Sequence, residues 1–160
     1  MDIFNKELFN FWGILEKEKV EYIMIGGLAV VLHGYVRATG DIDIWLNDTK
    51  NNRLKFSTVM KAYNYNLSNH EKIEFIPGWS DFYIGKLFKL DVIIAMKGLD
   101  HLTFEDCLKA ASIAEINGLK IPFLNIDHLI INKKATNRFK DQIDVKSLTA
   151  IKKVNKSEEE

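Results

Sequence analysis

The sequence is poor in the features that mark several large classes of protein. Cys107 is the only cysteine among 160 residues, which excludes an intramolecular disulfide framework and a cysteine-rich zinc site. Basic and acidic residues number 22 each, so the molecule as a whole has no net field that attracts nucleic acid or an anionic membrane. No apolar run is long enough to cross a bilayer, and the first residues lack the basic and apolar regions of a signal peptide. We therefore expect a cytoplasmic protein without membrane association.

The composition is that of one ordinary globular domain, with 47% hydrophobic and 28% charged residues. A chain of this length can bury a substantial core but is short for two domains. We expect a single domain over residues 1–154, with a core at about 20–95 and closing helices at about 125–153. The last residues, "NKSEEE", are polar and charged, so we expect a disordered tail at 155–160.

Hydrophobic periodicity predicts helices that bracket a small sheet. Apolar residues at helical spacing predict helices at 3–18, 28–35, 54–63, 103–111, 129–135 and 141–151. Short apolar or alternating runs predict strands at 22–25, 41–46 and, on either side of a turn at Gly85, within 82–96. Asn117-Gly118 between two strand-like runs predicts a hairpin. We expect an α/β (α+β) domain in which a small mixed β-sheet is flanked by helices.

Three aspartates lie inside apolar strand-like runs, where charge is costly. Residues two apart in a strand point to the same side, so Asp41 and Asp43 present their carboxylates on one face. Asp91 adds a third carboxylate within "LFKLDVIIA", where an unpaired charge costs several kcal/mol if it is buried. An ordinary ion pair with Lys89 is one explanation. A divalent cation fits three acidic groups on adjacent strands better, because Mg²⁺ binds carboxylate oxygens together with substrate phosphates.

The two glycines that precede the aspartates supply a complementary feature. Gly26 and Gly27 end an apolar strand and lead into a helix, and backbone N–H groups at such a turn can bind phosphate. Arg37 and Thr39 lie just before the aspartates and offer a cation and a hydroxyl to the same anion. Taken singly, a Gly-Gly pair is most often only a tight turn, and Asp-x-Asp is often a solvated strand end.

In combination, "GGLAVVLHGYVRATGDIDIWL" followed by an aspartate on a later strand resembles the nucleotidyltransferase superfamily of polymerase-β-like fold. It looks most like the small bacterial stand-alone members of toxin–antitoxin and abortive-infection operons. The resemblance implies that Gly26 and Gly27 hold nucleotide phosphates and that Asp41 and Asp43 bind Mg²⁺ or Mn²⁺. It also implies that Asp91 is a third ligand or the base that activates the acceptor. Many members have Gly-Ser where this chain has Gly-Gly, so one hydroxyl that can touch phosphate is missing.

The C-terminal segment resembles the closing region of the operon-type members. Eight basic residues and two acidic ones occur between residues 133 and 156, which is a local excess of positive charge. The matching positions are Lys133, Arg138, Lys140, Asp141 and Asp144. We expect Lys133 or Lys140 to reach the triphosphate, and the basic excess to contact nucleotide or an RNA backbone. A solvated helix face is the alternative explanation.

Three functions remain open at this point. The first is a Mg²⁺-dependent enzyme that moves a nucleoside monophosphate from an NTP to a hydroxyl of RNA, protein or a small molecule, as a toxin–antitoxin component. In this enzyme Asp91 is the candidate base, and its surroundings should raise its proton affinity when no metal is bound. The second is a catalytically inactive module that binds an operon partner. The third is a lincosamide-type antibiotic adenylyltransferase, a group with a similar layout and size. The sequence does not determine the oligomeric state.

Overall fold

The centre of the molecule is one mixed sheet of six strands in the order β3-β4-β2-β1-β6-β5. In this computed structural model, residues 5–75 and 82–158 are described. The strands are β1 (Tyr22–Ile25), β2 (Asp41–Leu46), β3 (Phe82–Ile84), β4 (Phe88–Ile93), β5 (Ser112–Ile116) and β6 (Leu119–Phe123). β2 runs antiparallel to β1 and parallel to β4, and β1 runs parallel to β6. The prediction of a small mixed sheet is thus confirmed.

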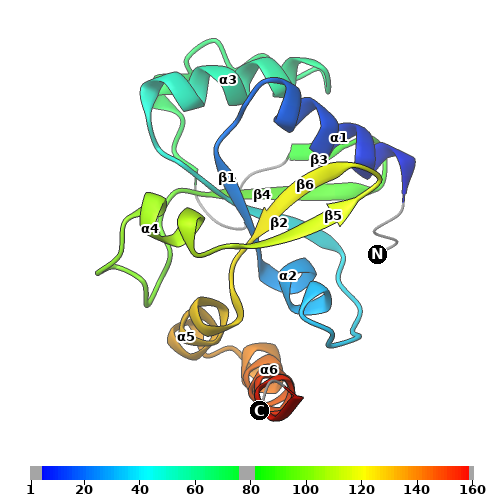
Figure 1. Ribbon diagram of the computed structural model, residues 1–160. Helices are drawn as coiled ribbons and strands as arrows, with labels where there is room; N and C mark the ends of the chain where they lie inside the picture. Colours follow the sequence, from blue (N-terminus) through cyan, green and yellow to red (C-terminus); the bar gives the residue numbers. More distant parts are fainter. Residues whose placement is uncertain (1–4, 76–81, 159–160) are drawn as a thin grey trace.

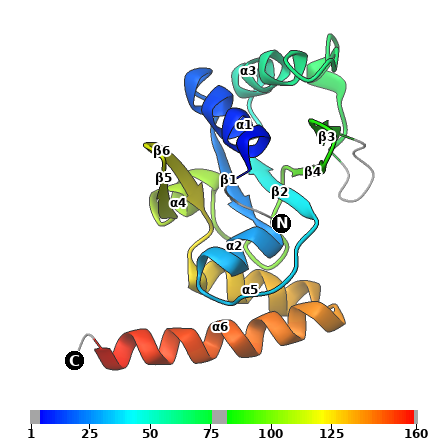
Figure 2. The same cartoon turned by 90° about the vertical axis from the view of Figure 1, so that its right-hand side faces the viewer.

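Helices cover both faces of this sheet, as two views at 90° show (Figure 1 and Figure 2). α1 (Lys6–Lys17) and α3 (Lys50–Lys61) lie on one face, and α2 (Gly26–Leu32), α5 (Ile126–Thr136) and α6 (Phe139–Glu158) lie on the other. The short α4 (Phe104–Lys109) lies beside the sheet, and a 3-10 turn, η1 (His70–Lys72), follows α3. Among the described residues, no helix combines the length and apolar character that a membrane span requires.

Local signals in the sequence explain where most of these elements begin. Asn5, Thr49 and Asn125 each cap the first turn of a helix by accepting a backbone hydrogen bond. Thr103 and Asp106 form a complete capping box at α4. Asn117 and Gly118, both with positive φ, make the turn of the β5–β6 hairpin. The predicted helix start at residue 103 and the predicted hairpin are therefore confirmed.

Several boundaries differ from the prediction. α2 begins at Gly26 itself, and α3 and α5 begin about one turn earlier than predicted, at Lys50 and Ile126. α6 continues to Glu158, so the structure has helix over most of the segment predicted to be a disordered tail. The Lys, Ser and Glu residues there are compatible with helix, and no glycine or proline interrupts them. Residues 1–4, 76–81 and 159–160, which include the start of the helix predicted at 3–18, part of the loop predicted at 64–80 and the end of the predicted tail, lie outside the described residues.

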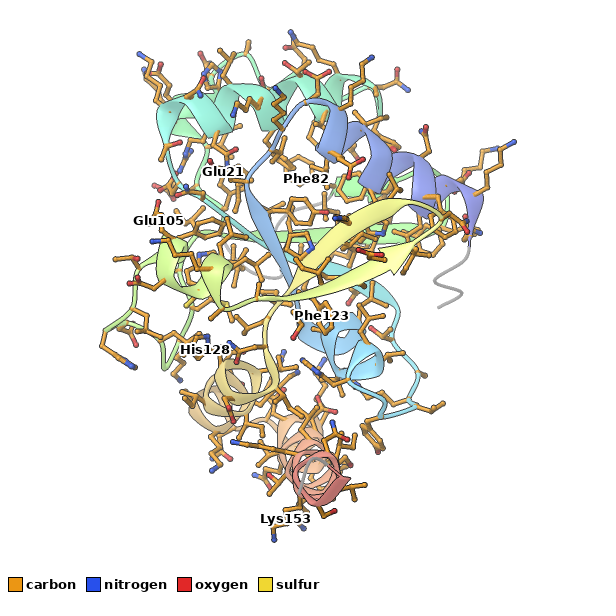
Figure 3. All side chains as sticks on the ribbon, in the orientation of Figure 1. Glu21, Phe82, Glu105, Phe123, His128 and Lys153 are labelled. Carbon is orange, nitrogen blue, oxygen red and sulfur yellow. The ribbon has the colours of Figure 1, made fainter. Side chains whose placement is uncertain are left out.

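A buried polar cluster fixes the register of β1 and β2 at one end of the sheet. Asn52 is 1% exposed, and it accepts a hydrogen bond from the Glu21 backbone and donates to the carbonyls of Glu21 and Asn47. Asn47 in turn donates to the carboxylates of Glu21 and Glu105, which lie on the same side of the molecule in Figure 3. With the register fixed, Ile25 is the partner of Asp43 at the opposite end of the strand pair. The glycine turn and the aspartates are therefore adjacent.

Candidate functional site

The three predicted aspartates come together where β2 and β4 run side by side. Asp43 of β2 is the register partner of Asp91 of β4, and Asp41 is the partner of Lys89. Since the strands are parallel and in register, Asp43 and Asp91 point to the same face of the sheet. Lys89 Nζ lies 3.9 Å from Asp91 Oδ1, so the ion pair considered as an alternative exists as a long contact. It does not involve Asp41 or Asp43.

The electrostatics of Asp43 show how closely the acidic groups are held. Burial is the largest of the causes that raise the pKa of Asp43 to about 6, and the negative charges of Asp91 and Asp41 act in the same direction. Lys133 and a hydrogen bond from the backbone of Gly27 act in the opposite direction. The structure gives a raised pKa at Asp43, and the raised proton affinity expected at Asp91 stays a prediction. Like charges gathered in this way favour a bound cation.

The Gly26-Gly27 turn packs closely against the Asp43 carboxylate and donates a hydrogen bond to it. Gly26 has φ +68°, and a Cβ there would lie 2.0 Å from Asp43 Oδ2. The N–H of Gly27, expected to be free for a phosphate, instead donates to Asp43. A Cβ on Gly27 would lie 2.5 Å from Arg37 Nη2 and 2.6 Å from Thr39 Oγ1. The space that a serine side chain would occupy in a Gly-Ser turn is thus filled by a cation and a hydroxyl from the loop before β2.

These groups line one cavity of about 720 Å³ between the sheet, α2 and the closing helices. All nine residues predicted from the sequence are on its wall: Gly26, Gly27, Arg37, Thr39, Asp41, Asp43, Asp91, Lys133 and Lys140. Sequence reasoning did not select other residues of the wall as site residues, among them Lys97, Asn132, Thr136 and Arg138. Arg138 was noted only as part of the closing region. Lys97 and Asn132 are far apart in the sequence and come together only in the fold, where Asn132 donates a hydrogen bond to the Lys97 carbonyl. Their neighbours in the chain therefore give no signal of a site.

Lys133 lies in a buried charge cluster and not on a solvated helix face. Its side chain is 2% exposed, and its Nζ lies 3.0 Å from both Asp141 Oδ1 and Asp144 Oδ2. Asp141 also accepts hydrogen bonds from Thr136 Oγ1 and from the backbone and side chain of Arg138. Burial opposes ionisation of Asp141, but these hydrogen bonds outweigh it and hold its pKa well below the usual range. The cluster fixes α5, α6 and the cavity wall together.

The donor set fits a hard divalent cation. Asp41, Asp43 and Asp91 offer carboxylate oxygens, which Mg²⁺ and Mn²⁺ prefer, and cationic side chains surround them. Within residues 5–75 and 82–158, no three acidic, histidine or cysteine side chains converge closely enough to enclose an ion by themselves. Mg²⁺ commonly takes one or two carboxylates and completes its shell with water and substrate phosphates. An ion at this site would therefore be held jointly by the protein and a phosphate ligand.

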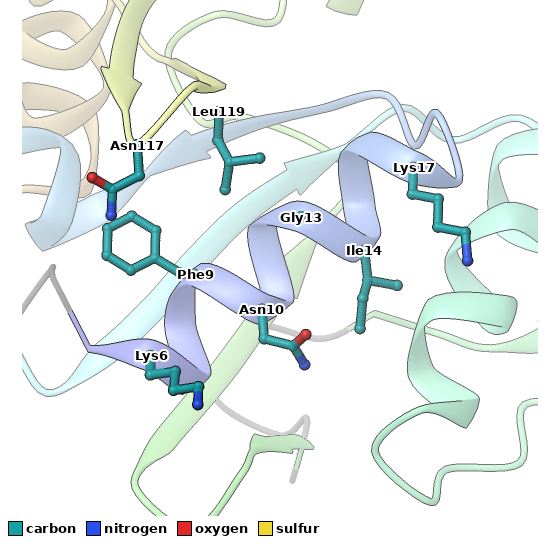
Figure 4. A pocket seen from close by; sticks show the side chains of 8 residues that line it. All are labelled: Lys6, Phe9, Asn10, Gly13, Ile14, Lys17, Asn117 and Leu119. Atoms are coloured by element: carbon teal, nitrogen blue, oxygen red, sulfur yellow. The ribbon is translucent and has the colours of Figure 1, made fainter.

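A second hollow, of about 860 Å³, lies elsewhere and lacks this chemistry (Figure 4). It is a wide, open depression between α1 and the β5–β6 turn, on the other side of the sheet from α5. Among the described residues, Lys6 and Lys17 are the charged ones that line it, and none of these lining residues offers a carboxylate for a metal ion. The cavity at β2 and β4 is the candidate site.

Comparison with known proteins gives one family match. Residues 7–157 match the model of a family described as "Nucleotidyltransferase of unknown function (DUF6036)". No curated protein matches the chain.

Solved structures of similar fold cover almost the whole chain. A lincomycin-bound lincosamide antibiotic adenylyltransferase, LnuA, is 24% identical, with a TM-score of 0.61 over 92% of this chain and 97% of that one. The antibiotic-resistance factor ANT(2'')-Ia is 13% identical, with a TM-score of 0.54 over 95% and 90% of the two chains. An antigenic nucleotidyltransferase-like protein from Paracoccidioides brasiliensis is 15% identical, with a TM-score of 0.54 over 89% and 72%. At these identities the likeness establishes the fold.

Proposed function

The chain belongs to the nucleotidyltransferase family whose model it matches, and on that premise we propose that it moves a nucleoside monophosphate from an NTP to a hydroxyl acceptor with Mg²⁺ or Mn²⁺. The observation that carries the proposal is the single cavity in which three aspartates face a set of cationic side chains. A volume of about 720 Å³ is within the usual range for sites that bind small molecules and cofactors.

The acidic wall would hold the cation. Asp41, Asp43 and Asp91 are the proposed ligands, and the raised pKa of Asp43 indicates that positive charge is favoured beside it. A bound divalent ion would supply charge stabilisation at the phosphoryl group being transferred. Asp91, the register partner of Asp43, is also the proposed base for the acceptor hydroxyl.

The basic wall would hold the triphosphate. Arg37 lies beside Gly27, and Lys133, Arg138 and Lys140 approach from the closing helices. In the proposed reaction the acceptor oxygen forms a bond to the α-phosphorus, the bond from that phosphorus to the bridging oxygen breaks, and pyrophosphate leaves with the electron pair. The hydroxyl proton passes to Asp91. Positioning and charge stabilisation account for the catalysis, as is general for phosphoryl transfer.

The acceptor class is a matter for experiment. The similar fold of a lincosamide adenylyltransferase makes a lincosamide one candidate, and RNA and protein hydroxyls of a toxin–antitoxin system are others. We would supply each of the four α-labelled NTPs with Mg²⁺ to bulk tRNA, cell protein, and a mixture of lincosamide and aminoglycoside. Label transfer by the wild type, absent from an Asp41→Asn, Asp43→Asn double variant, would support the proposal and identify the acceptor class. Equal labelling by the double variant would contradict it.

The same experiment separates the enzyme from an inactive module that binds an operon partner. Failure to label any acceptor, together with failure to bind any Mg²⁺–NTP, would favour the module. Stable association with the product of a neighbouring gene would then be its positive evidence.

A further inference from the structure

Asp144 of α6 contacts two cations of the cavity wall without lining the cavity itself. Its side chain is 1% exposed, with Lys133 Nζ 3.0 Å from Oδ2 and Arg37 Nε 3.3 Å from Oδ1. Lys133 comes from α5 and Arg37 from the loop before β2, so one carboxylate joins three separate parts of the fold. Both cations line the cavity, whereas Asp144 lies behind them.

The neighbouring Asp141 has a local structural role that Asp144 lacks. Asp141 accepts hydrogen bonds from Thr136 and from the Arg138 backbone, which stabilise the turn between α5 and α6. The two ion pairs found for Asp144, by contrast, both go to cations of the cavity wall. Local helix stability therefore does not explain a buried carboxylate at position 144.

The contact with Arg37 sets the direction of its guanidinium group. Nε faces Asp144, and Nη2 lies beside Gly27, at 2.5 Å from the place that a Cβ would occupy there. Because the guanidinium is a rigid plane, anchoring one edge fixes where the other edge points. Arg37 is thereby held against the glycine turn and beside Thr39.

The ion pairs leave hydrogen-bonding capacity unused. Within the described part of the chain, Arg37 Nε and both carboxylate oxygens of Asp144 have no partner with hydrogen-bond geometry, although the ion-pair distances are short. Charge, more than directed hydrogen bonds, holds the three groups together. Without Asp144, the largely buried Arg37 would lose this carboxylate partner, and Lys133 would keep only its ion pair with Asp141 among the described residues.

We infer that Asp144 is a positioning residue that holds Arg37 and Lys133 in place as a pair of triphosphate-binding cations. This inference rests on the proposed function, because the proposed function identifies the anion that Arg37 and Lys133 bind as the triphosphate. The direction in which anion affinity changes when Asp144 loses its charge distinguishes two explanations. Removing a negative charge near an anion site should strengthen anion binding if charge alone matters, and should weaken it if orientation matters.

The test measures binding of inorganic tripolyphosphate and of a non-hydrolysable Mg²⁺–NTP by calorimetry. Asp144→Asn keeps the shape of the side chain and removes its charge, and Arg37→Lys keeps the charge and removes the planar fork. We expect both to weaken tripolyphosphate binding by about tenfold or more. In an Arg37→Met background, Asp144→Asn should have a smaller effect, because one of the two cations that Asp144 holds is gone.

The matched control is Asp127→Asn. Asp127 forms an exposed ion pair with Lys152 that also joins α5 to α6, away from the cavity. This variant should leave binding unchanged. Melting temperatures recorded for all variants separate weakened binding from lost folding, and Arg37→Lys, at a partly exposed position, keeps the test valid if Asp144→Asn does not fold.

The outcomes distinguish the two proposals. If the wild type binds tripolyphosphate, and Asp144→Asn or Arg37→Lys binds it equally well or more tightly, the positioning role is overturned. The proposed function is then unaffected. Wild-type binding of tripolyphosphate that both variants weaken, without label transfer to any acceptor, supports the positioning role and counts against the enzyme. Absence of any wild-type binding of tripolyphosphate or NTP overturns both.

Discussion

Asp43 and Asp91 are register partners on adjacent parallel strands, and each raises the cost of a negative charge beside the other. Stability alone gives no reason to place two carboxylates opposite each other on a partly buried face of a sheet. The arrangement makes sense if the site normally holds positive charge. At this corner of the fold, the needs of function and of stability therefore conflict.

The first prediction concerns Asp43 and pH. Its pKa in the folded protein, about 6, lies above the ordinary value near 4, so folding favours the protonated form. The stabilising contribution is therefore present below about pH 4 and is lost as the pH rises through 6. In metal-free protein at pH 7.5, Asp43→Asn should raise the free energy of unfolding by about 1–3 kcal/mol while abolishing transfer. Urea unfolding at a series of pH values measures the difference.

Added Mg²⁺ should reduce that difference, because an ion relieves the repulsion in the wild type only. Asp127→Asn, which removes an exposed carboxylate away from the site, should show no gain of this kind. A wild type as stable as Asp43→Asn throughout pH 4–8 would contradict the assigned electrostatics.

The second prediction concerns the glycine turn. A methyl group at Gly26 would meet Asp43 Oδ2 at 2.0 Å, and alanine is strained at φ +68°. Gly26→Ala should cost about 1–3 kcal/mol of stability and displace Asp43, with loss of Mg²⁺-dependent nucleotide binding. The control is Gly13→Ala in α1, where a Cβ meets nothing within 4 Å. That change should raise stability by about 0.5–1 kcal/mol and leave binding intact. Thermal unfolding and nucleotide titration of both variants check the pair.

The third prediction concerns the buried cation. Lys133→Met leaves Asp141 and Asp144, both nearly inaccessible, without their shared ammonium group. Breaking a buried ion pair in this way should cost about 3–5 kcal/mol. Lys152→Met removes an exposed pair between the same two helices and should cost less than about 1 kcal/mol. Denaturant unfolding of the two variants gives the comparison, and equal losses would show that the Lys133 cluster is not the main link between α5 and α6.

The fourth prediction concerns acid. The folded-state pKa of Asp141 is depressed, so its contribution to stability is present above the ordinary value near 4 and is lost as the pH falls below it. The wild type should lose stability between pH 5 and 3 more steeply than Asp141→Asn, which is less stable at neutral pH but has no carboxylate to protonate there. Parallel curves for the two proteins over this range would contradict the assignment.

Much of this site could be predicted because its signals are local in the chain. Asp41 and Asp43 share a face through the two-residue period of a strand, and Thr103 with Asp106, or Asn117 with Gly118, specify a cap and a turn within four residues. Placing Asp91 beside Asp43 needed only that two strands pair in parallel.

The remaining features depend on contacts between distant segments, which have no period to reveal them. Nothing near Arg37 in the sequence indicates that Asp144 anchors it, and the burial of Lys133 reverses its usual preference for solvent. The N–H of Gly27 was expected to be free because helix starts usually leave such groups open, but Asp43 reaches it across the strand pair. The helical extension to Glu158 was missed because a charged terminus resembles disorder in composition alone.

The most direct test of the central claim is acceptor-independent. Binding of a non-hydrolysable NTP should be measured by calorimetry with Mg²⁺ and with EDTA, for the wild type and for Asp43→Asn. We predict binding by the wild type in Mg²⁺, and its loss both in EDTA and in the variant. Binding of equal strength under all three conditions, or no binding of any of the four nucleotides, would contradict the claim that these aspartates and the cationic wall form a metal–triphosphate site.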